Sequence, residues 1–178
     1  MKKNLFFAML ASLVLCGCGY TTHSVIPGNQ RSIHVDNFVN KIKVTSEISD
    51  RKMYYAYKPA MELDITREVI DRFLFDGIYK IKDAKNAYFL LKGQLVDYRR
   101  EPLSYDDSDN VTEYRLSVVV NLELYRTKDK ELVWQEKKFA GENTYPTAGQ
   151  GAKSENTALD EAIRDLARRI VERTVENW

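Results

Sequence analysis

Residues 114–124 read YRLSVVVNLEL, and this stretch decides the fold of the chain. Large apolar residues alternate with mostly polar ones, which is the two-residue period of a strand with one buried face. The apolar face comprises Tyr114, Leu116, Val118, Val120, Leu122 and Leu124. The polar residues of the opposite face are Arg115, Ser117, Asn121 and Glu123. The stretch therefore predicts a strand that covers a core on one side only.

Three further strands are predicted around this one. Before it, residues 87–99 (AYFLLKGQLVDYR) are dense in aromatic and aliphatic residues, which favours an inner strand. After it, a turn at 127–130 leads into a strand over 132–139 that becomes polar toward its end, so these two strands form a hairpin. Nearer the N-terminus, residues 33–39 are rich in β-branched and aromatic residues and predict a first strand, which could continue to Val44.

Two amphipathic helices complete the set of elements. The first starts at Pro59, whose φ is preset and whose missing N–H costs nothing at that position. It ends at Gly77, which suits the left-handed position that terminates helices. Its apolar stripe comprises Met61, Ile65, Val69 and Phe73 with their neighbours Ile70 and Leu74. The second runs to the C-terminus with an apolar stripe over 159–175. Ser154 or Thr157 can cap its start, and Thr157 with Asp160 resembles a capping box.

The predicted order is β-α-β-β-β-α. Two one-sided helices need one sheet face to cover, so we predict an α+β two-layer sandwich with both helices on one face of a four-stranded mixed sheet. The first two strands are separated by a helix and should be parallel, whereas the other pairs are antiparallel. No predicted element covers the second sheet face, which leaves that face available to another molecule.

Composition and motifs argue against several classes of function. Among 178 residues, 27 are basic and 26 acidic, so the chain lacks the basic excess typical of nucleic-acid binding. His23 and His34 do not stand at metal-ligand spacing, and no phosphate-cradling glycine loop, nucleophile elbow or zinc-protease helix motif occurs. We therefore expect no enzyme, no cofactor, no metal and no nucleic acid.

The N-terminal segment has the pattern of a lipoprotein signal. Lys2 and Lys3 precede an uncharged run at 5–15, which as a helix is too short to cross a bilayer. The sequence LCGC at 15–18 resembles a bacterial lipobox, with Cys18 as the lipidated first residue of the mature chain. We therefore expect a signal peptide over 1–17, a lipidated tether over 18–32 and a single α+β domain over 33–178.

Three basic residues are candidates for binding a phosphate. Arg99 and Arg100 end the predicted second strand with no acid four residues before either, and Lys153 precedes the last helix, where N–H groups are free. Ordinary surface charge is the alternative interpretation. In the last helix, by contrast, acids four residues before two of the arginines predict a self-neutralised, solvated face.

The hairpin before residue 114 is acidic. Its four acids could collect a divalent cation, but the glycine and spacing of an EF-hand loop are missing, which favours a solvated turn. The four residues are Asp106, Asp107, Asp109 and Glu113.

Three features in combination resemble one known family. They are the lipobox followed by Gly19 and Tyr20, the β-α-β-β-β-α order, and a third strand that opens with Thr112-Glu113-Tyr114. Together they resemble the lipopolysaccharide-assembly lipoprotein family, LptE. The resemblance implies a non-enzymatic, lipid-anchored protein on the periplasmic side of the outer membrane of a Gram-negative bacterium.

The resemblance also implies partners and contact residues. The partner would be the LptD β-barrel, which the chain would plug in a 1:1 complex and help to assemble, and the ligand would be lipopolysaccharide on its way to the cell surface. Family contacts near the end of the second strand and just before the last helix correspond most nearly to Arg99, Arg100 and Lys153. The acids at 106–109 depart from this pattern, because they would repel phosphates.

The alternative function is a different outer-membrane lipoprotein, one that activates a periplasmic cell-wall synthase. Such a protein reaches inward to the cell wall and would need a long tether. The tether expected here spans only about 45 Å at full extension. Its length favours the barrel partner.

Overall fold

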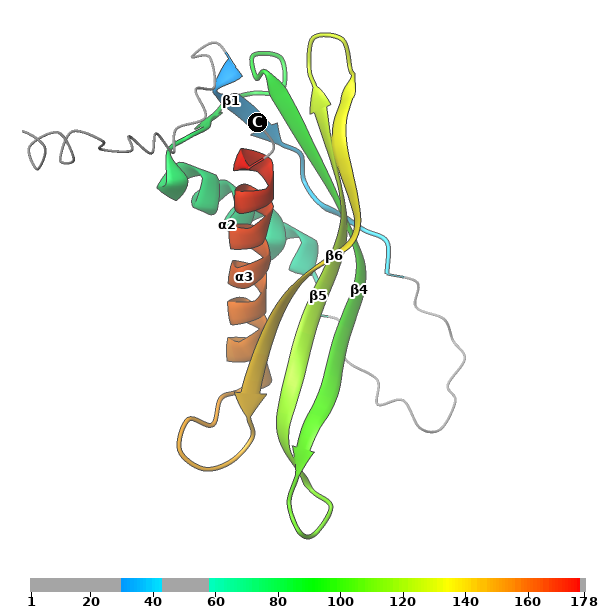
Figure 1. Cartoon of the computed structure of the whole chain (residues 1–178), viewed down its shortest axis with the longest axis vertical. Coiled ribbons are helices and arrows are strands. Elements are labelled where there is room, and N and C mark those ends of the chain that lie inside the picture. Colours follow the sequence, from blue (N-terminus) through cyan, green and yellow to red (C-terminus); the bar gives the residue numbers. More distant parts are fainter. Residues whose placement is uncertain (1–29, 43–57, 177–178) are drawn as a thin grey trace, which may run out of the picture.

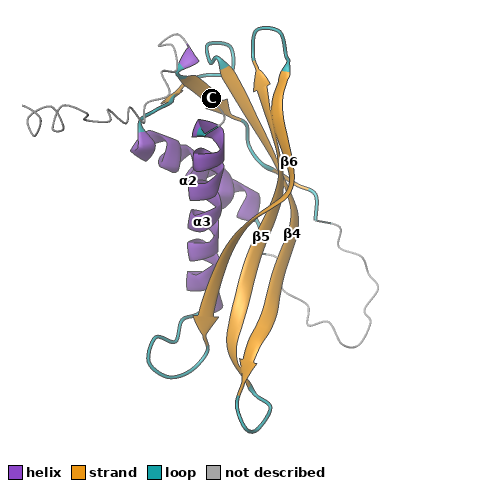
Figure 2. Cartoon of the chain, in the orientation of Figure 1, coloured by secondary structure: helices purple, strands orange, loops and turns teal. Residues whose placement is uncertain are grey.

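The computed structural model describes residues 30–42 and 58–176. The expectations for the signal peptide, Cys18 and nearly all of the tether lie outside these residues. The elements in chain order are β1 (Ser32–Val35), β2 (Val39–Asn40), α2 (Met61–Asp76), β3 (Lys80–Ile81), β4 (Phe89–Tyr105), β5 (Val111–Arg126), β6 (Leu132–Pro146) and α3 (Glu155–Val175). The sheet forms one layer and the two helices the other (Figures 1 and 2), which confirms the α+β sandwich.

The sheet has the predicted strand directions and is larger than predicted. Its order is β3-β1-β4-β5-β6, with β2 also paired to β4. The pairing of β1 with β4 is parallel, and the β4–β5 and β5–β6 pairs are antiparallel, as expected. Two short strands, β2 and β3, raise the total from the predicted four to six. Strand β4 is 17 residues long and continues well past the predicted end at Arg99.

The predicted strand over 33–39 is interrupted by Phe38. Regular pairing ends at Val35, and the Asp36 N–H makes the last bond to β4 before the break, at 2.9 Å to the Leu91 carbonyl. The Phe38 ring then packs in the core directly against Gly93 of β4, where a Cβ would lie only 2.1 Å from the ring. The Phe38 N–H donates to Thr66 Oγ1 of α2 at 2.9 Å, so the detached backbone keeps a buried partner. Pairing with β4 resumes at Val39.

Thr66→Val is therefore expected to lower the free energy of unfolding by about 1–3 kcal/mol, because it leaves the buried Phe38 N–H without its acceptor. Urea unfolding measures the change. Thr174→Val is a matched control: Thr174 is buried as well, but its hydroxyl only donates to the helical Ile170 carbonyl. An equal loss in both variants would contradict the role assigned to the Phe38 bond.

The helix ends follow local signals in part. Helix α2 ends at Gly77, which has a φ of 73° and so takes the predicted left-handed position. Its predicted start at Pro59 is wrong, because Ala60 has a left-handed conformation and the helix begins at Met61. Helix α3 is capped by Ser154, whose hydroxyl accepts from the Thr157 N–H at 3.1 Å. The alternative cap at Thr157 is wrong, because Thr157 already lies within the helix.

Helix α3 packs very closely on the sheet. A Cβ at Gly141 of β6 would lie 2.4 Å from the Leu166 backbone nitrogen. Because the neighbouring atom belongs to helical backbone, only glycine at 141 allows this approach.

The outer edge of β6 is covered by side chains of α3. Arg169 donates to the Ala140 carbonyl, and Asp165 accepts from the Glu142 N–H at 3.1 Å. Lys138 has a positive φ of 56° at an irregularity in the β5–β6 register. The predicted pairing of Asp165 with Arg169 is present at 4.0 Å, and the Arg169 side chain is partly exposed while one of its N–H groups also bonds to the sheet edge.

Candidate functional site

A cluster around Arg100 lies on the inner side of the sheet, next to the start of α3. The Arg100 guanidinium lies 4.5 Å from the ring centroid of Tyr114, which stacks on Tyr145 at 5.9 Å. Glu155, the first residue of α3, forms an ion pair with Arg100 and accepts a hydrogen bond from the Tyr98 hydroxyl at 2.9 Å. We call these five residues the Arg100 cluster.

Two tyrosines of the cluster, Tyr98 and Tyr145, hold their protons more tightly than a free tyrosine. Burial, reinforced by the Glu155 carboxylate, raises the pKa of Tyr98 and of Tyr145 above the ordinary value. Because Tyr98 keeps its proton, its hydroxyl is a donor that points at the same carboxylate as Arg100. The cluster thus holds one anionic group between a cation and a hydroxyl, which is the chemistry of an anion-binding site.

Arg99 lies on the opposite face of the sheet. It is about half exposed and contacts Asp97 at 3.3 Å and Glu101 at 3.6 Å. Neighbouring strand residues point to opposite faces, so Arg99 and Arg100, which both lie within the longer β4, are on different sides of the sheet.

Lys153 lies at the same end of the fold as the Arg100 cluster. It stands two residues before Glu155, and its ammonium contacts both carboxylate oxygens of Glu161 at 2.8 and 2.7 Å. This contact is the main reason why the pKa of Glu161 is lowered. The structure therefore brings Arg100 and Lys153 to one end of α3 and gives each a glutamate partner.

Lys153→Gln is expected to raise the pKa of Glu161 toward its ordinary value, because the variant removes the ammonium that stabilises the ionised form. A lowered folded-state pKa stabilises the fold above the unfolded-state pKa, and this contribution is lost as the pH falls through the folded-state value. The variant should therefore lose part of the acid sensitivity of the wild type. Carbon-13 NMR of the glutamate carboxyl measures the titration, with Arg99→Gln as control. An unchanged Glu161 titration in Lys153→Gln would refute the contact.

The acidic hairpin between β4 and β5 is a hydrogen-bonded turn. Asp106 accepts from the Ser108 N–H at 2.8 Å and the Asn110 N–H at 2.9 Å, and the bonds from Asn110 chiefly lower its pKa. Within residues 30–42 and 58–176, no group of three or more His, Cys, Asp or Glu side chains gathers to hold a metal.

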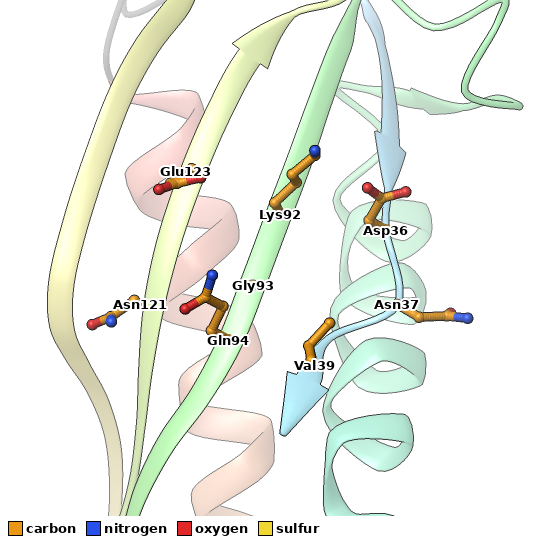
Figure 3. Close-up of a pocket in the computed structure, with 8 residues that line it drawn as sticks. All are labelled: Asp36, Asn37, Val39, Lys92, Gly93, Gln94, Asn121 and Glu123. Atoms are coloured by element: carbon orange, nitrogen blue, oxygen red, sulfur yellow. The ribbon is translucent and has the colours of Figure 1, made fainter. Parts of the chain in front are cut away.

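The outer sheet face is polar and holds a small hollow (Figure 3). The hollow, of about 200 Å³, opens where β1 gives way to β2, and carboxylates of Asp36 and Glu123 lie near Lys92 and Gln94 in its lining. Ser117 belongs to this face, but the expectation that it is open to solvent is wrong. The residue is 2% exposed, and its hydroxyl donates to the Glu142 carboxylate. The remaining residues of the face leave it predominantly charged and polar.

Comparison with known proteins decides the family. A family model described as LptE, lipopolysaccharide-assembly, matches residues 31–174, which takes in both long helices and nearly the whole described chain. The chain belongs to the LptE family. LptE proteins are non-enzymatic outer-membrane lipoproteins of lipopolysaccharide assembly, so this LptE chain acts in that process and is not an enzyme.

Two solved structures share the fold of this LptE chain at low identity, and a third resembles it more distantly. A Xanthomonas campestris protein is 12% identical with a TM-score of 0.56, over 85% of this chain and 90% of the other. A hypothetical protein of Chlamydia trachomatis is 11% identical with a TM-score of 0.53, over 82% and 96%. The rare lipoprotein B of Shewanella oneidensis is 16% identical with a TM-score of 0.45, over 79% and 92%. No curated protein matches the chain by sequence.

The described helices of this LptE chain do not have the character of membrane spans. None within residues 30–42 and 58–176 combines the length and the apolar content that crossing a bilayer requires.

Proposed function

We propose that this LptE protein is anchored through lipid on Cys18 at the periplasmic side of the outer membrane, plugs the LptD β-barrel in a 1:1 complex, helps that barrel to assemble and binds lipopolysaccharide in transit. Residues 1–17 would be the signal peptide and 18–32 the tether. The observation that carries the proposal is the family match over residues 31–174.

The outer sheet face supports burial inside a barrel. Charges of both signs line it, among them the row Asp97, Arg99 and Glu101 on β4 and Arg115 on β5. The interiors of outer-membrane barrels are polar, whereas their lipid-facing surfaces are apolar. A mixed-charge sheet face therefore suits the lumen of a barrel.

The length of the sheet suits a plug as well. Strand β4 has 17 residues, and at the usual rise per residue it extends about 55 Å. The apolar band of an outer-membrane barrel is about 25 Å tall. A plug of this length would cross the lumen and leave one end in the periplasm.

Arg100 and Lys153 are the proposed contacts to the phosphates of lipopolysaccharide. They lie at one end of α3, and each already holds a carboxylate in the position that a phosphate oxygen would take. A phosphate carries more charge than a carboxylate and offers more acceptors, so it can displace Glu155 and Glu161. Arg99 is proposed as a further, separate contact because it projects from the other face.

Co-purification tests the partner. The native, lipidated protein is isolated through a C-terminal tag from detergent-solubilised envelopes, and the proteins that remain bound are identified. We expect stoichiometric recovery of LptD. Recovery of a cell-wall synthase would support the alternative function, and recovery of no barrel would overturn the plug.

Charge removal tests the ligand site. Arg100→Gln with Lys153→Gln is expected to weaken binding of lipopolysaccharide by about a hundredfold, because each of the two charge-assisted bonds to a phosphate contributes on the order of 1.5 kcal/mol. Glu155→Gln should strengthen binding, since it removes the competing carboxylate. Fluorescence titration with purified lipopolysaccharide measures both, and unchanged affinity in the double variant would reject this site.

A further inference from the structure

Three large apolar side chains are exposed together at the C-terminal end of α2. Phe75 is 81% exposed, Leu74 60% and Ile78 37%. The core-facing residues of the same helix, including Val69 and Phe73, are fully buried. The prediction that Leu74 belongs to this apolar stripe is therefore wrong, because its side chain lies outside the core. We call Leu74, Phe75 and Ile78 the α2-end patch. A solvent-exposed group of this kind usually marks a surface that meets something apolar.

The patch lies beside the point where the N-terminal segment joins the fold. The Lys80 N–H donates to the Arg31 carbonyl at 3.0 Å, and Ser32 pairs with Lys80 in the sheet. Figure 1 shows the end of α2 close to β1 and β3. If Cys18 carries the lipid, the 18–30 segment reaches at most about 45 Å, so the bilayer is always within reach of the patch. This step rests on the proposed function.

The surroundings of the patch are basic. Residues 71–85 together with Arg31 hold five basic residues, Arg31, Arg72, Lys80, Lys82 and Lys85, against three acids, Asp71, Asp76 and Asp83. The other end of the sheet has the opposite character: residues 97–113 hold six acids and two arginines, next to the exposed apolar side chains of Leu103 and Tyr105. These two exposed apolar groups of the described chain therefore lie in different settings, one basic and one acidic.

We propose that the α2-end patch docks on the anionic phospholipid surface of the membrane that holds the anchor. Phe75 and Leu74 enter the boundary between headgroups and acyl chains, and the nearby lysines contact lipid phosphates. Docking would orient the chain with α2, β1 and β3 at the bilayer and the acidic β4–β5 hairpin directed away from it.

Vesicle binding tests the proposal without the anchor. The chain starting at residue 19 keeps every described element and contains no cysteine, because the two cysteines are Cys16 and Cys18. Its co-sedimentation with vesicles of phosphatidylethanolamine and phosphatidylglycerol is measured at low salt. Leu74→Ser with Phe75→Ser should reduce the partition constant between vesicles and solution by about tenfold, because two apolar side chains no longer insert into the bilayer. Both side chains are exposed, so the fold should survive, which thermal unfolding checks.

Leu103→Ser with Tyr105→Ser is the matched control. It removes two exposed apolar side chains from the acidic end and should leave vesicle binding unchanged. Equal binding by the α2-end variant and the wild type, or an equal loss in the control, would overturn the proposal. A bimane label on Phe75→Cys adds a direct readout, because a lipid-borne quencher should reach it and should not reach a label on Tyr105→Cys.

Membrane docking by the α2-end patch and the plug function are refuted by different results. Loss of LptD recovery from envelopes by the lipidated Leu74→Ser, Phe75→Ser variant, with vesicle binding intact, would make the patch a contact with the barrel instead and overturn membrane docking. Failure to recover LptD with the wild-type protein would overturn the plug and leave the vesicle result in force.

Discussion

Gly141→Ala is expected to lower the free energy of unfolding by at least about 3 kcal/mol. The new Cβ would lie 2.4 Å from both the nitrogen and the Cβ of Leu166 and 2.5 Å from its Cα. These atoms belong to the middle of α3 and cannot rotate away, so the whole helix would have to move off the sheet. Helix α3 carries much of the core, including Leu159, Leu166 and Ile170.

Urea unfolding of Gly141→Ala measures the loss. Gly149→Ala is the control, since nothing lies within 4 Å of a Cβ there and only its positive φ of 79° is strained. That strain should cost about 1 kcal/mol. A Gly141→Ala variant as stable as the control would mean that α3 is not held as closely as the geometry indicates.

Gly93→Ala is the second large effect, at about 2–4 kcal/mol. Its Cβ would lie 2.1 Å from the Phe38 ring, which is buried and fixed by the bond from its own N–H to Thr66. Unlike Leu166 at Gly141, the obstacle here is a side chain. Truncating it should therefore relieve the clash.

A double-mutant cycle with Phe38→Ala measures this relief. Phe38→Ala alone opens a cavity and should cost about 3–5 kcal/mol. The double variant should lose about 2 kcal/mol less than the sum of the single losses, since the clash is absent once the ring is gone. Additive losses would show that Gly93 and Phe38 are not coupled.

The element order could be predicted because the signals were local and periodic. The alternation over 114–124 fixed β5 and its buried face, and the four-residue spacing from Met61 fixed α2. The parallel pairing of β1 with β4 followed from the helix between them. Gly77 and Ser154 ended and began helices for reasons that act within a few residues.

The candidate site depended on a feature that no local pattern revealed. A register shift between Leu95 and Asp97 turns Tyr98 and Arg100 to the helix side and Arg99 to the outer side. Without that bulge, the alternation from Leu95 would have placed these residues on the opposite faces. The sequence identified the residue types of a phosphate site, whereas the bulge decided which arginine joins it.

The interruption of the first strand had a similar cause. Phe38 fits a strand by composition. Because Gly93 has no side chain, however, the Phe38 ring can pack against the Gly93 backbone in the core. Glycine inside a strand can indicate such a close approach, and this was the one signal in the sequence that could have located the break.

The covered edge of β6 bears on how the chain behaves on its own. An open strand edge can recruit a strand from another copy, and repeated recruitment gives aggregates. Here Arg169 bonds to a carbonyl and Asp165 to an N–H of the edge. The irregularity at Lys138, where φ is positive, also interrupts the regular strand geometry. A second copy therefore finds no continuous row of free backbone groups over this stretch, and the sheet resists self-templated polymerisation.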